Sequence, residues 1–181
     1  MDFKPTPEHV ALANRAHAEF GKVLPPELVL AIIAKESGGS FCAWNPEPKY
    51  RYLWDVRKNA AFRKLTDTEA AAKFPPKDFP CLAGDPDQEF WGQQASWGLC
   101  QIMGAVAREL GYRRPYLAEL VRDEWAAIYH AMKHLSHYLT RYGLERGISS
   151  YNHGPGWQGD PAQDVYCQTV LAYMKDLKVG P

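Results

Sequence analysis

The sequence lacks an excess of either charge and lacks long apolar runs. Lysine and arginine together number 21, and so do aspartate and glutamate. This balance argues against a dedicated nucleic-acid-binding or polybasic membrane-surface protein, because a polyanion would meet no counter-charged face. One local basic cluster, Arg108, Arg113 and Arg114, is interpreted as a solvated helix end. No stretch approaches the roughly 18 apolar residues of a transmembrane helix, so we expect no membrane insertion.

Two further absences concern processing and cross-linking. The N-terminal residues lack the apolar core of a secretory signal peptide, so we expect synthesis in the cytoplasm and delivery by another route. The four cysteines are scattered without a Cys-x-x-Cys pair and are interpreted as mostly free, buried thiols. In an oxidising compartment a Cys42–Cys81 bridge is the alternative. The other two cysteines are Cys100 and Cys167.

What is present indicates a folded, mainly helical protein. Hydrophobic residues make up 46% and aromatic residues 13% of the 181, which excludes a disordered chain. We expect one domain over residues 1–181. Apolar periodicity, caps and glycine stops predict helices at 6–22, from Pro25 to the Gly38-Gly39 stop, and at 66–73, 103–110, 123–142 and 162–177.

Residues 43–95 have a different character. Prolines, aromatics and short polar runs replace the helical pattern, and only 50–56 is typical of a strand. We interpret 43–95 as an ordered, loop-rich or small β insert. A loop segment of this length in a compact chain usually has a function, so we expect it to form a wall or lid of a cleft.

Glu36 is the first candidate for chemistry. It lies four residues after Ile32 and three after Ile33, so it continues the apolar face of its helix. It also falls in the last turn, at the negative end of the helix dipole. Burial and the dipole both disfavour the carboxylate and are expected to raise the pKa of Glu36, as a general acid requires. The alternative is a side chain that reaches solvent or pairs with a lysine.

Three short strings, taken in order, carry a family resemblance. They are Glu36-Ser37 at the end of an apolar helix, the string 98–103 (Gly-Leu-Cys-Gln-Ile-Met), and 151–154 (Tyr-Asn-His-Gly). In this order they resemble the lytic transglycosylases of the soluble, lysozyme-like superfamily, which includes goose-type lysozyme. The resemblance spans about 24–173. It implies a lysozyme-like α+β fold, a helical bundle-like domain in which the insert flanks a sugar-binding cleft.

The resemblance also implies roles for individual residues. Glu36 resembles the catalytic acid, which protonates the glycosidic oxygen and then acts as base. Positions that resemble the sugar-binding or cleft-wall residues of the family are Ser37, Gln101, Met103, Tyr151, Asn152 and Tyr166, to which Trp97 is added as a candidate for stacking on sugar. Tyr151 has an ordinary core residue as its alternative, and Gln101 a structural amide that satisfies backbone groups.

The chain departs from the family pattern in two respects. Cys100 stands where the family usually has Met, a swap of one soft side chain for another. Glu36 and Gln101 are 65 positions apart, more than is usual, because of the insert. Aromatic residues in or beside the insert are candidates for sugar stacking, with a local hydrophobic cluster as the alternative. They are Trp44, Tyr52, Trp54, Trp91 and Trp97.

The implied reaction depends on a second carboxylate. A lytic transglycosylase needs none, because the muramyl 6-hydroxyl attacks intramolecularly and gives a 1,6-anhydro product. Hydrolysis by two carboxylates does need one. Where goose-type lysozymes have a helper Asp, this chain has Met103 and Gly104. Anhydro-forming cleavage of the MurNAc-β-1,4-GlcNAc bond is therefore favoured. Carboxylates of the insert that could serve a muramidase, though more typical of solvated loop charges, are Asp55, Asp85, Asp87 and Glu89.

Other hypotheses stay open at this point. A non-catalytic glycan-binding or structural protein has little use for an acid on an apolar face, and chitin or chitosan is a less favoured substrate.

His130, His134 and His137 share a helical face that could hold zinc, but we interpret them as a solvent-exposed polar face and expect no metal and no cofactor. We expect a monomer that acts on peptidoglycan glycan strands in the periplasm. Delivery would be of the phage or prophage endolysin kind, through a holin, or by a virion or secretion machine.

Overall fold

The computed structural model describes residues 3–48, 50–82 and 84–177, and for Ala71 only the backbone. The chain forms two compact units, one made of Met1–Ser40 with Ala131–Pro181 and the other of Phe41–His130. The segment 43–95 lies within the second unit, and its role as an insert in a single domain stays a prediction. In the described ranges, no helix combines the length and apolar character that a membrane span requires.

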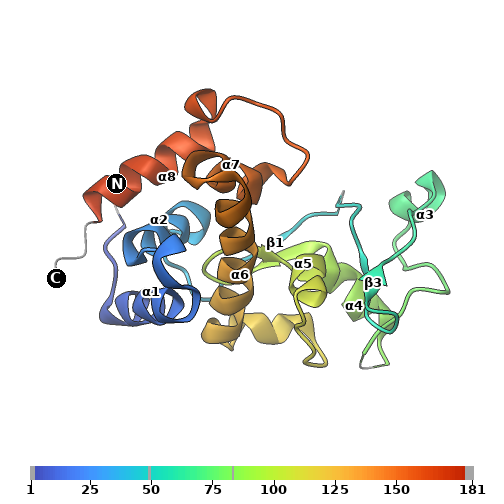
Figure 1. The fold of residues 1–181 in the computed structure, drawn as a ribbon. Coiled ribbons are helices and arrows are strands. Elements are labelled where there is room, and N and C mark those ends of the chain that lie inside the picture. Colours follow the sequence, from blue (N-terminus) through green and yellow to red (C-terminus); the bar gives the residue numbers. More distant parts are fainter. Residues whose placement is uncertain (1–2, 49, 83, 178–181) are drawn as a thin grey trace. The chain divides into compact units, whose positions relative to one another are not determined.

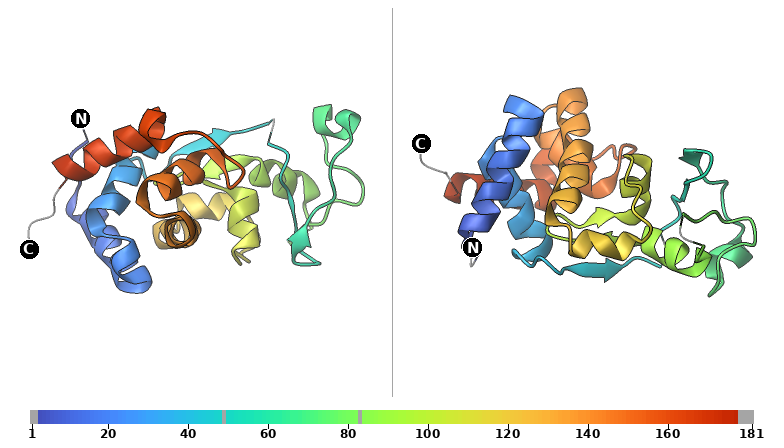
Figure 2. Two further views of the ribbon diagram at one scale, coloured as in Figure 1. Left: turned by 45° about the horizontal axis from the view of Figure 1, so that its top comes forward. Right: turned by 90° about the horizontal axis from the view of Figure 1, so that it is seen from below.

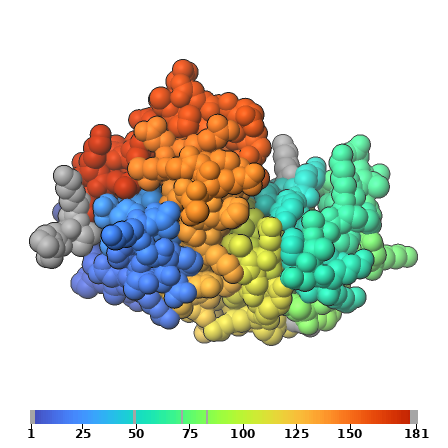
Figure 3. All heavy atoms as spheres, viewed as in Figure 1, coloured from blue at the N-terminus to red at the C-terminus, as the bar shows by residue number. Residues whose placement is uncertain are grey.

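The first unit is built around one buried helix. The six residues from Leu28 to Ile33 have no exposed surface. This helix, α2, packs against α1 and α8 of the same unit (Figures 1 and 2), and the space-filling view shows α8 lying against these first helices (Figure 3). The elements are α1 (Pro7–Phe20), η1 (Gly21–Val23), α2 (Pro26–Ser37), the second half of α6 (Glu124–Tyr142), α7 (Leu144–His153), η3 (Pro161–Gln163) and α8 (Val165–Asp176).

Local sequence signals set the helix ends. Thr6 caps α1 by accepting a hydrogen bond from the backbone of His9. Gly38 ends α2 in the left-handed conformation, φ 60°, which a residue with a Cβ adopts only at a cost. The predicted last helix is interrupted, because Asp164 caps a new helix, α8, after the short turn η3. Helix α7 was not predicted, since its small polar residues show no long apolar stripe.

The second unit combines short strands with helices. β4 (Ala95–Trp97) pairs in antiparallel fashion with β1 (Trp44–Pro46) on one side and β5 (Ile102–Met103) on the other, while β2 (Trp54–Asp55) pairs with β3 (Ala60–Ala61). Only 54–55 of the strand predicted at 50–56 therefore forms. The remaining elements are α3 (Asp67–Ala71), α4 (Pro86–Gln93), α5 (Gly104–Glu109), η2 (Leu117–Val121) and the first half of α6.

The segment 43–95 has a hydrophobic core of its own. Leu53, Leu65, Phe79 and Phe90 are buried together. The Phe79 ring meets that of Phe90 edge to face at 5.2 Å between centroids. The segment is more regular than predicted, because α4 occupies 86–93, where a loop was expected. The Asp85-Pro86 pair is the sequence signal that indicates such a helix start.

Candidate active site

Glu36 lies at the exposed end of the buried helix α2. Its side chain is half-buried, one turn beyond residues without exposed surface. Burial raises the pKa of the Glu36 carboxyl above its ordinary value, against the opposing effects of a hydrogen bond from Tyr166 and the charge of Lys35. At a given pH, the protonated fraction of the Glu36 carboxyl is therefore larger than that of an ordinary glutamate. The sequence-based expectation of a raised pKa agrees with this environment.

Tyr166 is the hydrogen-bond partner of Glu36. Its hydroxyl donates to Oε1 of the carboxylate, and within the part of the chain that the structure describes no other group makes a hydrogen bond to Glu36. The ring is buried, and the ammonium of Lys35 lies 5.5 Å from its centroid. Sequence reasoning had placed Tyr166 in a cleft wall and had not predicted this bond.

Ser37 uses its hydroxyl to end helix α2. The hydroxyl donates to the carbonyl of Ile33 at 3.2 Å and accepts from the N–H of Gly39 at 3.2 Å. The second of these bonds gives the Gly39 N–H, just beyond the helix end, a partner. Ser37 thus holds the turn that follows Glu36, and its predicted contact with sugar stays a prediction.

Tyr151 and Asn152 lie in the last turn of α7, which packs against α8. Tyr151 is half-buried, with its ring centroid 5.9 Å from that of His134. Burial lowers the pKa of His134 to about 4, with the charge of His137 as a lesser cause, so His134 is neutral beside Tyr151 near neutral pH. Asn152 is exposed to solvent. The two side chains that the resemblance assigns to sugar binding are thus neutral, polar and partly accessible.

His153 and Asp164 form a contact that sequence reasoning missed. Nε2 of His153 lies 3.1 Å from Oδ1 of Asp164, and its ring stacks on Trp157 at 5.0 Å. The same Oδ1 accepts the N–H of Tyr166 and so caps α8. Burial disfavours the Asp164 carboxylate, but neighbouring donors, His153 and the Tyr166 N–H among them, lower its pKa overall. Asp164 therefore fixes the start of the helix that presents Tyr166 to Glu36.

The second motif forms the turn between β4 and β5. Gln101 has φ 49°, an uncommon conformation for a residue with a side chain. Its amide is engaged on both sides: Oε1 accepts from the Ser96 hydroxyl at 2.8 Å and Nε2 donates to the carbonyl of Gly98 at 2.9 Å. Gln101 thus has the structural-amide contacts foreseen as the alternative, and its sugar-binding role stays a prediction.

Met103 and Trp97, which were both predicted to contact sugar, lie on opposite faces of the sheet. Met103 pairs with Ser96, whereas Trp97 pairs with Ile102 and Trp44. Adjacent residues of a strand point to opposite faces, so Trp97 lies on the sheet face opposite to Met103. Trp97 is buried and donates its indole N–H to the carbonyl of Gly92 at 2.9 Å.

Three of the four carboxylates considered as a second catalytic group accept hydrogen bonds from other protein groups. Asp55 accepts the N–H groups of the turn that follows it. Asp85 caps α4 and also accepts from the amide of Gln88. Glu89 is buried and pairs with Arg108, with contacts of 2.9 and 2.7 Å. Asp87 is half-buried in the first turn of α4.

Three of the sequence-based interpretations are wrong about exposure. Arg108, interpreted as part of a solvated helix end, has no exposed surface, and Glu89, interpreted as a loop charge, is 4% exposed. They are 19 residues apart and neutralise each other inside the second unit. His130 is buried against Tyr112, not on the solvent-exposed polar face that was expected.

Cys100 and Cys167 are buried as predicted, but Cys42 is exposed and Cys81 half-buried, without a bridge between them. In the described residues, no group of three or more His, Cys, Asp or Glu side chains is arranged to hold a metal ion.

Comparison with protein-family models identifies the family of the chain. The family model described as the transglycosylase SLT domain matches residues 14–169, which is most of the chain. Searches of curated proteins and of solved structures found no match.

Proposed function

The chain belongs to the transglycosylase SLT domain family of peptidoglycan lytic transglycosylases with a lysozyme-like fold, and from this premise we propose that Glu36 is its catalytic acid and base. The observation that carries the proposal is the half-buried carboxyl of Glu36, with a raised pKa and with Tyr166 bonded to one oxygen. A carboxyl whose pKa is raised keeps its proton to a higher pH than an ordinary glutamate does, and it can release that proton to a substrate oxygen.

The proposed reaction needs one carboxyl group. Protonated Glu36 gives its proton to the glycosidic oxygen between N-acetylmuramic acid and N-acetylglucosamine, and the bond from that oxygen to C1 of the muramyl residue breaks. The muramyl 6-hydroxyl then forms a bond to C1, and its proton passes to the Glu36 carboxylate. The enzyme is restored, and the product is a 1,6-anhydromuramyl end without uptake of water.

Tyr166 supports the ionised stage of this cycle. When Glu36 has lost its proton, the hydroxyl of Tyr166 donates a charge-assisted hydrogen bond to the carboxylate. This bond lowers the pKa of Glu36 against the larger effect of burial. The carboxyl can thus release its proton without leaving an unpaired charge in a half-buried position.

The hydrogen-bond partners of three of the four other candidate carboxylates favour this route over hydrolysis. A muramidase mechanism would require a second carboxylate that activates water or attacks C1. Asp55, Asp85 and Glu89 are already engaged in a turn, a helix cap and a buried ion pair. Intramolecular attack by the substrate's own hydroxyl requires no such group.

The substrate contacts remain part of the proposal. Amide and hydroxyl groups can bond sugar hydroxyls and the N-acetyl carbonyl, and aromatic rings can pack on pyranose faces. We assign these contacts to Ser37, Gln101, Met103, Tyr151, Asn152 and Tyr166. Trp97 lies on the sheet face opposite to Met103, so we propose that any contact of Trp97 with sugar is made from that other face. Since peptidoglycan lies outside the cytoplasmic membrane, we also propose delivery of the endolysin kind, through a holin, or by a virion or secretion machine.

Product mass tests the proposal directly. Purified peptidoglycan is incubated with the protein and with Glu36→Gln, and the soluble muropeptides are analysed by mass spectrometry. We expect products one water lighter than hydrolytic muropeptides, and none from Glu36→Gln. Full-mass products with reducing ends would instead identify a muramidase. No products from folded protein would leave a glycan-binding protein.

A further inference from the structure

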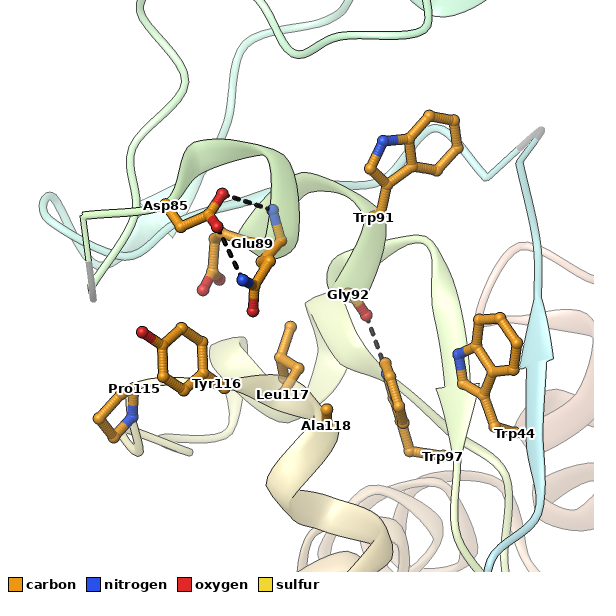
Figure 4. Close-up of a pocket in the computed structure, with 11 residues that line it drawn as sticks. Trp44, Asp85, Glu89, Trp91, Gly92, Trp97, Pro115, Tyr116, Leu117 and Ala118 are labelled. Atoms are coloured by element: carbon orange, nitrogen blue, oxygen red, sulfur yellow. Dashed lines mark hydrogen bonds between the residues drawn. The ribbon is translucent and has the colours of Figure 1, made fainter.

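A cavity in the second unit is lined by aromatic side chains. It has a volume of about 210 Å³ and lies between α4 and η2 (Figure 4). Trp44 of β1, Trp91 of α4 and Tyr116, just before η2, stand around it. Buried Trp97 and Leu117 also line it. The volume is below the roughly 300–1,000 Å³ of typical small-molecule pockets, which suits one ring of a longer chain.

The aromatic residues around the cavity are unusually open to solvent. Trp44 is 56% exposed, Trp91 41% and Tyr116 40%. Leaving such large apolar surfaces in water forfeits the free energy that burial would provide. A cluster of exposed apolar side chains on a monomeric surface commonly marks a binding site.

The charges near the cavity indicate the class of ligand. Asp85 is engaged with Gln88, and Glu89 is neutralised by Arg108. Both oxygens of Asp85 therefore already accept hydrogen bonds, which leaves this one charged carboxylate of the described lining less available to hold a cation among the aromatic rings. Among the residues that the structure describes, no basic side chain lines the cavity, which argues against a phosphate polymer. Aromatic faces next to neutral polar groups such as the Gln88 amide suit an uncharged sugar, with apolar ring faces and hydroxyl edges.

This cavity is separate from the motif that carries Gln101. Trp44 and Trp97 are cross-strand partners and share one face of the sheet. Ser96, which bonds the Gln101 amide, pairs with Met103 on the other face. A sugar against Trp44 and Trp91 would therefore occupy a different side of the sheet from the Gln101 turn.

We propose that the cavity bounded by Trp44, Trp91 and Tyr116 is a second, non-catalytic site for an N-acetylated sugar of the glycan strand. The inference rests on the proposed function, because it takes the same polymer as ligand. A second contact on a long strand raises the effective concentration of the enzyme at its substrate. It thereby keeps the protein on insoluble peptidoglycan between cleavage events.

Binding to insoluble peptidoglycan in a Glu36→Gln background tests the inference without turnover. Trp91→Ala and Tyr116→Ala are introduced separately, with Phe74→Ala as the matched control, because Phe74 is 60% exposed and lies outside the cavity. Loss of one stacking contact of about 0.5–1.5 kcal/mol predicts an apparent Kd roughly two- to tenfold weaker. Thermal unfolding establishes that each variant is folded.

The outcomes separate the two proposals. Weaker binding by both cavity variants, with Phe74→Ala equal to the parent, supports the second site. Equal binding by all four proteins would overturn it, even if the Glu36-intact protein releases anhydro products. Conversely, absence of anhydro products from the Glu36-intact protein would overturn the proposed reaction while the binding series still decides the sugar site. Soluble N-acetylglucosamine oligomers should compete for the cavity, and inorganic polyphosphate should not.

Discussion

The hydroxyl of Tyr166 donates a hydrogen bond to Oε1 of Glu36, a residue 130 positions earlier in the chain. The bond joins the first turn of α8 to the last turn of α2, two helices that pack against each other. Through it, the acidity of a half-buried carboxyl depends on how α8 begins. Asp164, which caps α8, therefore influences Glu36 without touching it.

Removal of the Tyr166 hydroxyl should change both the rate and its pH dependence. In Tyr166→Phe the carboxylate loses a hydrogen bond of the charged type, worth about 1.5–3 kcal/mol, so we expect kcat to fall roughly ten- to hundredfold. Because this bond lowers the pKa of Glu36, the alkaline limb of the pH–rate profile should move to higher pH. An unchanged alkaline limb would contradict a direct link between the two groups.

Glu36→Gln should gain stability while it loses activity. The raised pKa of Glu36 means that its contribution to stability is present at low pH, where it is protonated in both states, and is lost as pH rises through its folded-state pKa. A glutamine side chain does not ionise, so the variant does not lose this stability as the pH rises. We therefore expect Glu36→Gln to have the higher Tm at neutral pH and the same Tm as the parent in acid. Glu109→Gln, on the exposed surface of α5, is the control and should show no such pH-dependent gain.

Asp164→Ala should loosen the start of α8. Loss of a helix cap costs about 1 kcal/mol, which corresponds to a fall in Tm of roughly 2–4 °C for a chain of this length. The pKa of Asp164 is lowered, so its stabilising effect is present above its ordinary pKa and is lost as pH falls through the folded value. The difference from the parent should therefore shrink in acid.

A matched cap serves as the control for Asp164. Asp160 caps the short turn η3 in the same way, accepting from the N–H of Ala162 at 3.0 Å, but it is exposed. We expect Asp160→Ala to lower Tm less and to leave kcat near that of the parent. Asp164→Ala should lower kcat as well, because the helix that it caps carries Tyr166. Equal effects of the two substitutions would argue against a positioning role for Asp164.

Arg108→Met should be among the most destabilising single changes. It leaves the Glu89 carboxylate buried without its partner, at a cost of about 3–5 kcal/mol in urea unfolding. The double variant Glu89→Met/Arg108→Met should recover much of this loss, because no charge is then buried. Arg63→Met is the contrasting control. Although Arg63 lowers the pKa of Glu69 to about 2, the pair is solvent-exposed, so Arg63→Met should change urea unfolding far less than Arg108→Met does.

Much of the helical framework could be predicted from local patterns. The 123–142 periodicity, the Thr66 cap and the Gly38 stop correspond to α6, α3 and the end of α2. Glu36 could be identified because an apolar helix carries it on its buried face. The Asp85-Pro86 start of α4 was present in the sequence too, but it was obscured by the surrounding prolines and short polar runs.

Other features could not be predicted from spacing. The pair of Glu89 and Arg108 joins α4 to α5, and no local rule relates residues 19 positions apart. Trp97 and Met103 point to opposite faces because of how β4 and β5 pair. Strands of two and three residues are too short for a sequence pattern to predict this pairing. His130 was assigned to an exposed face because the helix was considered alone, before the burial of its ring against Tyr112 was known.

The sequence by itself pointed to Glu36 as the candidate acid, since the apolar periodicity of its helix and the order of three motifs can be followed along the chain. The tertiary structure alone decided what surrounds that acid and which other carboxylates are already engaged. Tyr166 reaches Glu36 only because α8 packs on α2, and Glu89 loses its solvent only because Arg108 is buried beside it. Hydrogen bonds and desolvation depend on distances across the fold, and these distances arise only when the helices and strands pack.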